Sequence, residues 1–143
     1  MKIPEVVIKN VKKYFTGKEV IVQKPKSIYT RTIGEDRRCL AYYGGGIAHP
    51  VAEVVVKDKT QNLDIVYHIA YMPEIVKEFP RIERIEGWAY NEWTFHYNKK
   101  TVRDKYLESL VRNSIFYDGT VTGGLFLHLG KGYFLLYYLQ GID

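Results

Sequence analysis

The sequence predicts one α+β domain in which strands outnumber helices, folded as a small curled sheet or a small β-barrel with about three flanking helices. The chain has 143 residues, the size of a single domain, and no tract rich in Gly, Ser or Pro divides it. Hydrophobic residues make up 46% of it and aromatic residues 15%, enough for a packed core. About seven short β-branched or aromatic runs alternate with a few amphipathic stretches.

The first amphipathic stretch covers residues 4–15 and is expected to be a helix. Its apolar side chains recur at helical spacing, at Val7, Ile8, Val11, Tyr14 and Phe15. Pro4 suits a first helical turn, and Gly17 follows the last one. The β-branched run 20–22 then predicts a short strand, because such side chains favour extended backbone.

The middle of the chain is expected to hold three strands and a short helix. The strands are predicted over residues 39–43, 51–57 and 64–72 from their β-branched and aromatic side chains. A triple glycine at 44–46 predicts a turn after the first strand, and the polar residues 58–62 predict a turn after the second. A helix is expected over residues 73–79, where Pro80 ends it.

Two further predictions cover residues 87–113. The aromatic stretch 87–97 is expected to form one strand, with a bulge near Asn91, where the alternation of aromatic residues changes parity. The stretch 101–113 is expected to form a helix. Its predicted N-cap is Thr101, because Asp104 stands three positions later.

The last segment, residues 125–142, predicts a β-hairpin that turns at residues 130–132. It carries more aliphatic side chains than one face of a two-stranded ribbon can hide, namely Leu125, Leu127, Leu129, Leu135, Leu136 and Leu139. The helix over 101–113 has one apolar stripe and would cover only part of this area. We therefore expect a homodimer that associates through the hairpin.

Composition also limits compartment and chemistry. No apolar run approaches the roughly 20 residues of a membrane-spanning helix, and no signal-peptide stretch follows Met1, so we expect a cytoplasmic protein without a membrane partner. The single cysteine, Cys39, excludes an internal disulfide and a multi-cysteine metal site. The four histidines show no metal-ligand spacing, so no metal or other cofactor is expected.

Positive charge is concentrated in the first part of the chain. Through Lys59 there are 12 basic and six acidic residues, whereas the rest holds nine basic and ten acidic residues. Basic side chains neutralise phosphates, and a neighbouring aromatic ring stacks on an unpaired base. The sequence therefore predicts a module that binds RNA or single-stranded DNA. The residues expected to bind it are Lys24, Lys26, Arg31, Arg37, Arg38 and Tyr43.

Two other functions stay open from the residues alone. Asp36, Glu53 and Lys57, with a histidine, would suit a small metal-dependent nuclease or other phosphoester hydrolase, in which carboxylates hold Mg²⁺ and lysine polarises the phosphate. Their spacing differs from the E-x-K pattern that puts both side chains on one strand face two residues apart, so no catalytic residue is assigned. The other alternative is a structural protein that assembles through the C-terminal hairpin.

Residues 3–58 also carry a resemblance to a known family. They contain, in order, a helix, the run 17–25 with its pair Lys24-Pro25, Tyr29, Ile33-Gly34, a strand that ends in Tyr42-Tyr43, a glycine loop and Ala52-Glu53-Val54. This order resembles the opening of PUA-like barrels of the ASCH and EVE type. The resemblance implies a closed β-barrel with flanking helices and a basic cleft for RNA or a modified base. It places that cleft at Lys24, Lys26, Arg37, Arg38 and Tyr43.

Overall fold

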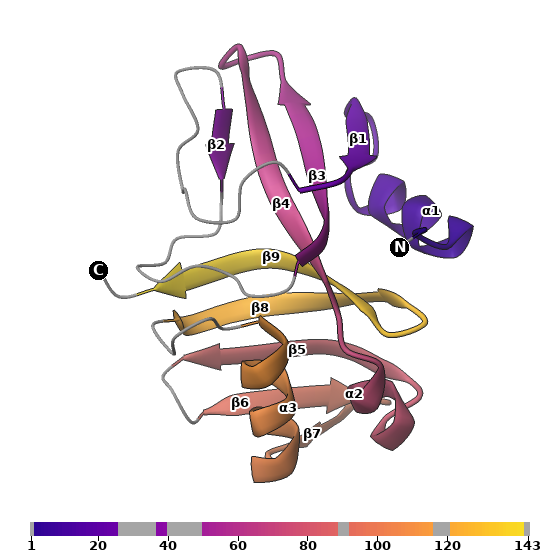
Figure 1. Ribbon diagram of the computed structural model, residues 1–143, viewed down its shortest axis with the longest axis vertical. Helices are drawn as coiled ribbons and strands as arrows, with labels where there is room; N and C mark the ends of the chain where they lie inside the picture. Colours follow the sequence, from indigo (N-terminus) through magenta and orange to yellow (C-terminus); the bar gives the residue numbers. More distant parts are fainter. Residues whose placement is uncertain (1, 26–36, 40–49, 89–91, 116–120, 142–143) are drawn as a thin grey trace.

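A computed structural model describes residues 2–25, 37–39, 50–88, 92–115 and 121–141 of the protein (Figure 1). These residues form three helices, α1 (Glu5–Tyr14), α2 (Pro73–Glu78) and α3 (Lys105–Ile115). They also form nine strands, β1 (Val20–Gln23), β2 (Arg37–Cys39), β3 (Pro50–Asp58), β4 (Leu63–Tyr71), β5 (Ile82–Trp88), β6 (Trp93–Tyr97), β7 (Lys100–Val102), β8 (Val121–Gly130) and β9 (Tyr133–Gly141). The predicted α+β class with a majority of strands is confirmed.

The strands belong to one sheet that does not close on itself. Eight of them follow an antiparallel path in the order β1-β3-β4-β9-β8-β5-β6-β7, and β2 pairs with β4 in parallel. Strand β4 has two partners along the same edge, because its first half pairs with β2 and its last four residues, from His68, pair with β9. Strands β1 and β7 end the path without pairing to each other in the described residues. The sheet is therefore open, and the expected closed barrel is not what these residues form.

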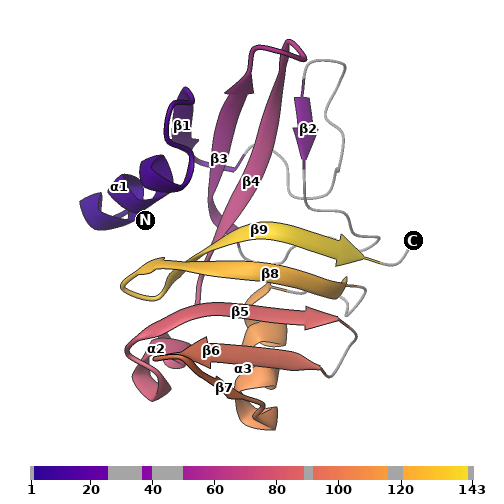
Figure 2. The same ribbon diagram turned by 180° about the vertical axis from the view of Figure 1, so that it is seen from behind.

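Helix α3 covers one face of β5 and β6, in front of them in Figure 1 and behind them in Figure 2, and α1 packs on the opposite face of the sheet. Successive residues of β9 alternate between two hydrophobic clusters. Phe134 and Leu136 belong to a cluster with α2 and α3, whereas Tyr133 and Leu135 belong to a cluster with α1. Both faces of this strand are thus buried within one chain. A strand that is buried on both faces carries a continuous run of apolar residues.

The position of the C-terminal hairpin in the sheet bears on the expected homodimer. Strands β8 and β9 form the predicted hairpin, but they lie in the middle of the sheet rather than at its edge. The side chains of Phe134 and Leu135, which face opposite ways, are both fully buried. The homodimer stays a prediction, because most of the described apolar side chains of the hairpin are buried within the chain, although Tyr137 is exposed.

Most local predictions are confirmed, and one strand is corrected. Helices α1 and α2 and strands β1, β3 and β4 lie where the sequence predicts them, whereas β2 overlaps its prediction only at Cys39 and residues 40–46 lie outside the described part. The prediction of a single bulged strand over 87–97 is wrong. The chain instead forms two strands, β5 and β6, which pair antiparallel with Gly87 opposite Trp93. The change of parity among the aromatic residues therefore comes from a reversal of chain direction between β5 and β6 and not from a bulge.

The start of α3 is also corrected. Thr101 lies in β7 opposite His96 and is part of an extended segment, so it does not cap the helix. Asp104 does so, because its Oδ1 accepts the backbone N–H of Leu107 at 3.1 Å. An aspartate side chain satisfies one of the amide groups that a helix start leaves without a partner.

Candidate nucleic-acid interface

The structure separates the residues that the sequence predicts as a binding site. Lys24 is exposed and directly follows β1, whereas Arg37 and Arg38 lie in β2, where they pair in register with Asp64 and Ile65 of β4. Strands β3 and β4 stand between β1 and β2, so the two groups are at least about 14 Å apart across the sheet at a strand spacing of about 4.8 Å, and they are also offset along the strands. Lys26, Arg31 and Tyr43 lie outside the described residues, as does the glycine loop. No single cluster of the predicted residues is therefore seen.

A denser basic surface lies on the outer side of α1. The helix buries Val7 and Val11, and Phe15 beyond its end is buried with them. Its other side carries the exposed Lys9, Lys12 and Lys13, and further exposed lysines stand before and after the helix at Lys2 and Lys18. None of these five lysines forms an ion pair with a described residue. We call these five residues the α1 lysine surface.

The helix is held against the hairpin turn, which adds another cation. The Asn10 Nδ2 donates a hydrogen bond of 2.7 Å to the carbonyl oxygen of Leu129 in β8. At Gly130 the backbone has φ +110°, and an added Cβ would meet Val6 at 3.7 Å, so the turn packs directly on α1. Lys131 follows in the turn and is exposed. The rigid attachment therefore presents the helix and the turn as one surface.

An exposed aromatic ring lies beside these lysines. Tyr14, at the last position of α1, is 49% exposed. Together with Asn10, Lys13 and His128 it lines a pocket of about 420 Å³. A tyrosine ring next to a lysine supplies both a stacking surface for a base and a cation for the adjoining phosphate.

Two other aromatic residues near α1, Phe15 and Tyr67, belong to the core. Tyr67 in β4 packs against Phe15 with ring centroids 4.8 Å apart, and it also stacks with Tyr137 of β9, with ring centroids 5.7 Å apart. Burial, with Tyr137 nearby, raises the pKa of Tyr67 to about 12, so its hydroxyl stays neutral at physiological pH. Burial raises the pKa of Tyr133 as well, with Tyr71 as a second cause. Tyr67 and Tyr133 thus serve packing, whereas Tyr14, Tyr71, Tyr106 and Tyr137 are exposed.

Two residues of the nuclease alternative, Glu53 and Lys57, lie on one face of β3. Glu53 stands opposite His68, and Lys57 stands opposite Asp64. Glu53 and His68 are fully buried, and the Gln23 Nε2 donates to the Glu53 Oε1 at 2.7 Å. The Lys57 Nζ lies 3.1 Å from the Asp64 Oδ1, so this lysine is engaged in an ion pair. Asp36 lies outside the described residues. Among the residues that are described, no group of three or more His, Cys, Asp or Glu is placed to hold a metal ion.

The lysines of α1 add to the positive charge of the first 59 residues but are not among the residues that the sequence predicts as a binding site. The signal was present, because Lys9, Lys12 and Lys13 fall between the apolar positions of the helix. Lys131 carries no such signal, since only the docking of α1 on the hairpin turn brings it to this side.

Comparison with known proteins adds no relative. No family model matches the chain, and no curated protein or solved structure matches it either. The resemblance to PUA-like barrels therefore stays a prediction. None of the helices in the described ranges is long and apolar enough to cross a membrane.

Proposed function

We propose that the protein binds single-stranded nucleic acid, RNA or DNA, through the α1 lysine surface, Lys131 and Tyr14. The observation that carries the proposal is the set of exposed lysines on one helix, none with an ion pair in the described chain, next to a half-exposed tyrosine. Lysines without an acidic partner are free to neutralise phosphates, and each contact releases counterions. The ring of Tyr14 would stack on an unpaired base.

The residues predicted from the sequence belong to the proposal as a second contact region. Lys24, Lys26, Arg31, Arg37, Arg38 and Tyr43 add positive charge and one ring to the same half of the chain. Lys24, the residue of this set that directly follows β1, is exposed.

The salt dependence of binding tests the proposal. We expect a fluorescently labelled 20-nucleotide RNA or DNA strand to bind in an anisotropy titration, with an affinity that falls steeply as salt rises. The triple variant K9A/K12A/K13A should bind more weakly, and its slope of log affinity against log salt should decrease by up to about 2, since each contact to a single strand contributes about 0.7. Tyr14→Ala should weaken binding with little change of slope, and Tyr14→Phe should restore it.

A matched control removes the same charge elsewhere. Lys59, Lys77 and Lys99 are exposed and lie on the β3–β4 turn, on α2 and between β6 and β7. The variant K59A/K77A/K99A should keep most of the affinity. Equal losses in the two triple variants, or no binding at low salt, would overturn the proposal. Recovery of the intact strand after incubation with Mg²⁺ or Mn²⁺ separates binding from hydrolysis, and cleavage that disappears in Glu53→Ala would favour the nuclease alternative.

A further inference from the structure

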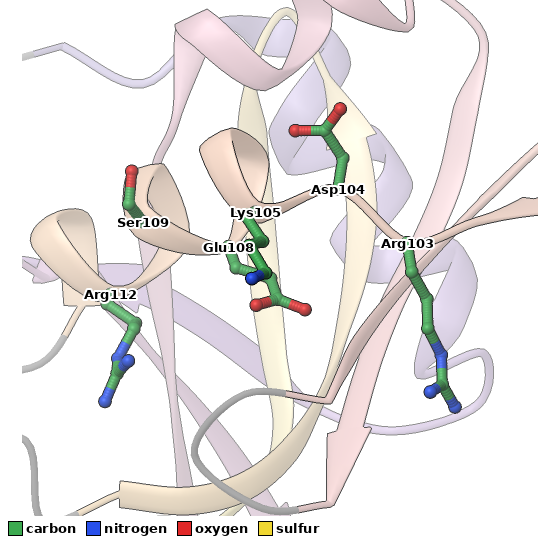
Figure 3. Close-up of a pocket in the computed structure, with 6 residues that line it drawn as sticks. All are labelled: Arg103, Asp104, Lys105, Glu108, Ser109 and Arg112. Atoms are coloured by element: carbon green, nitrogen blue, oxygen red, sulfur yellow. The ribbon is translucent and has the colours of Figure 1, made fainter.

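The described cavities differ in the charge of the residues that line them. One of about 590 Å³ lies along α3 (Figure 3), and its lining residues are Arg103, Asp104, Lys105, Glu108, Ser109 and Arg112. The carboxylates of Asp104 and Glu108 offset the charges of Arg103 and Lys105, and Arg112 already has a partner. This cavity therefore offers no surplus positive charge to an anion.

The pocket next to Tyr14 has a different character. Its volume is about 420 Å³, and its described lining residues are Asn10, Lys13, Tyr14 and His128. None of these four is acidic, and the Lys13 side chain is exposed. A nucleotide of a bound strand would therefore meet a cation here, with no opposing carboxylate among the described lining residues.

His128 offers this pocket a ring and no free nitrogen. Its Nδ1 faces the carbonyl oxygen of Ile82, and its Nε2 accepts the N–H of Gly132. Both nitrogens are thus used by the backbone. The polar side chains left to recognise a ligand, among the described residues of the pocket, are those of Asn10, Lys13 and Tyr14.

The amide of Asn10 is held in one orientation. Its Nδ2 donates to the carbonyl oxygen of Leu129 at 2.7 Å, and because only the nitrogen of an amide can donate, this contact decides which amide atom faces β8. The Oδ1 lies on the other side of Cγ, turned away from that carbonyl, and forms no hydrogen bond with a described residue. Asn10 stands three and four positions before Lys13 and Tyr14, so the three side chains are neighbours on the helix. Oδ1 is therefore a fixed acceptor beside a cation and a ring.

We propose that this pocket takes one unpaired base that carries an exocyclic amino group, cytosine or adenine, in preference to uracil or thymine. The base would stack on the Tyr14 ring, its amino group would donate to the Asn10 Oδ1, and its phosphate would pair with Lys13. Uracil and thymine carry a carbonyl oxygen in place of the amino group, so they would face Oδ1 with a second acceptor. The inference rests on the proposed nucleic-acid binding and adds a base preference to it.

Two matched pairs of DNA strands test the preference in an anisotropy titration of the full chain. Deoxycytidine and deoxyuridine strands form one pair, deoxyadenosine and deoxyinosine strands the other, and each pair exchanges the amino group for a carbonyl. In at least one pair the amino strand should bind about threefold to tenfold more tightly, which is what one uncharged hydrogen bond contributes. The pair that shows the preference tells whether the pocket takes a pyrimidine or a purine. The ratio should not change as salt rises, because both strands of a pair carry the same phosphates.

The outcomes separate this inference from the proposed function. Equal affinities in both pairs, or tighter binding of the carbonyl strand in either pair, would overturn the base preference and leave the nucleic-acid surface standing. Absence of binding by all four strands at low salt would instead overturn the proposed function, and the preference with it.

Variants assign the preference to the pocket. Asn10→Ala should bring the ratio of the two affinities close to one, whereas Asn113→Ala, which removes an exposed asparagine from α3, should leave it unchanged. Because Asn10→Ala also removes the bond to Leu129, a second variant is needed. Tyr14→Ala removes a half-exposed ring and should lower the ratio as well, and Tyr106→Ala, on α3, is its control. A preference that survives in both pocket variants would overturn the assignment.

Discussion

At the scale of single residues, His128 is a titratable group whose two ring nitrogens both contact backbone groups of the fold. Its Nδ1 lies 3.0 Å from the carbonyl oxygen of Ile82, and its Nε2 accepts the N–H of Gly132 at 3.3 Å. The Nδ1 therefore carries the proton, and the ring is a neutral imidazole that links β8, the hairpin turn and the start of β5. Burial lowers the pKa of His128 below its ordinary value of 6.5, although the bond to Ile82 acts in the opposite direction.

This pKa predicts a loss of stability in acid. In the unfolded chain the imidazole takes up a proton near pH 6.5, whereas the folded protein resists it until a lower pH. The unfolded state then binds more protons, so the free energy of unfolding should fall as pH decreases through 6.5. We expect urea unfolding at pH 7.5 and pH 5.5 to show a larger loss for the wild type than for His128→Gln. Other titrating groups are common to both proteins, so equal losses would contradict the assignment.

At the scale of elements, the local capping pattern and the structure give different starts for α3. The pattern places the cap at Thr101, whereas the structure assigns residues 100–102 to β7 and the cap to Asp104. Pairing with β6 holds Thr101 in an extended conformation, opposite His96. Strand pairing thus takes precedence over a cap signal that would begin the helix one turn earlier.

Two alanine variants distinguish these caps. Asp104→Ala should lower the free energy of unfolding by about 1 kcal/mol, because the N–H of Leu107 loses its acceptor. Thr101→Ala should change it by no more than about 0.5 kcal/mol, since its side chain is exposed. Chemical denaturation of both variants measures the difference. A larger cost at Thr101 than at Asp104 would show that the helix begins earlier than described.

At the scale of the whole molecule, one sheet separates two hydrophobic clusters. The cluster under α2 and α3 includes Trp93, Phe95 and Phe126, and the cluster under α1 includes Val54 and Ile69. Strands β4, β8 and β9 contribute to both. The central residues of these strands are therefore buried on both faces within one chain.

Neighbouring residues of β9 test this arrangement. Phe134→Ala should cost about 3–5 kcal/mol and Leu135→Ala about 2–5 kcal/mol in free energy of unfolding, because each leaves a cavity in a different cluster. Lys131→Ala, in the exposed turn, is the control and should cost little. The urea midpoint of the wild type should not depend on protein concentration. A midpoint that rises with concentration would show that a second copy covers part of the chain, as the apolar hairpin first suggested.

What the sequence determined by itself is local. The spacing of Val7 and Val11 predicts α1, the residues from Pro73 predict α2, and the glycines around Lys131 predict the hairpin turn, where the backbone has positive φ. Each signal is contained in neighbouring residues, so it is read without knowing the rest of the fold. The charge of the α1 lysine surface is local in the same sense.

The tertiary structure alone decided which strands become neighbours. It placed β2 and β9 along one edge of β4 and brought Glu53 opposite His68. These contacts join residues that are distant in sequence, and no single pair determines them. Their stability comes from burying two clusters at once, which depends on the fit of many side chains and is not written in any local pattern.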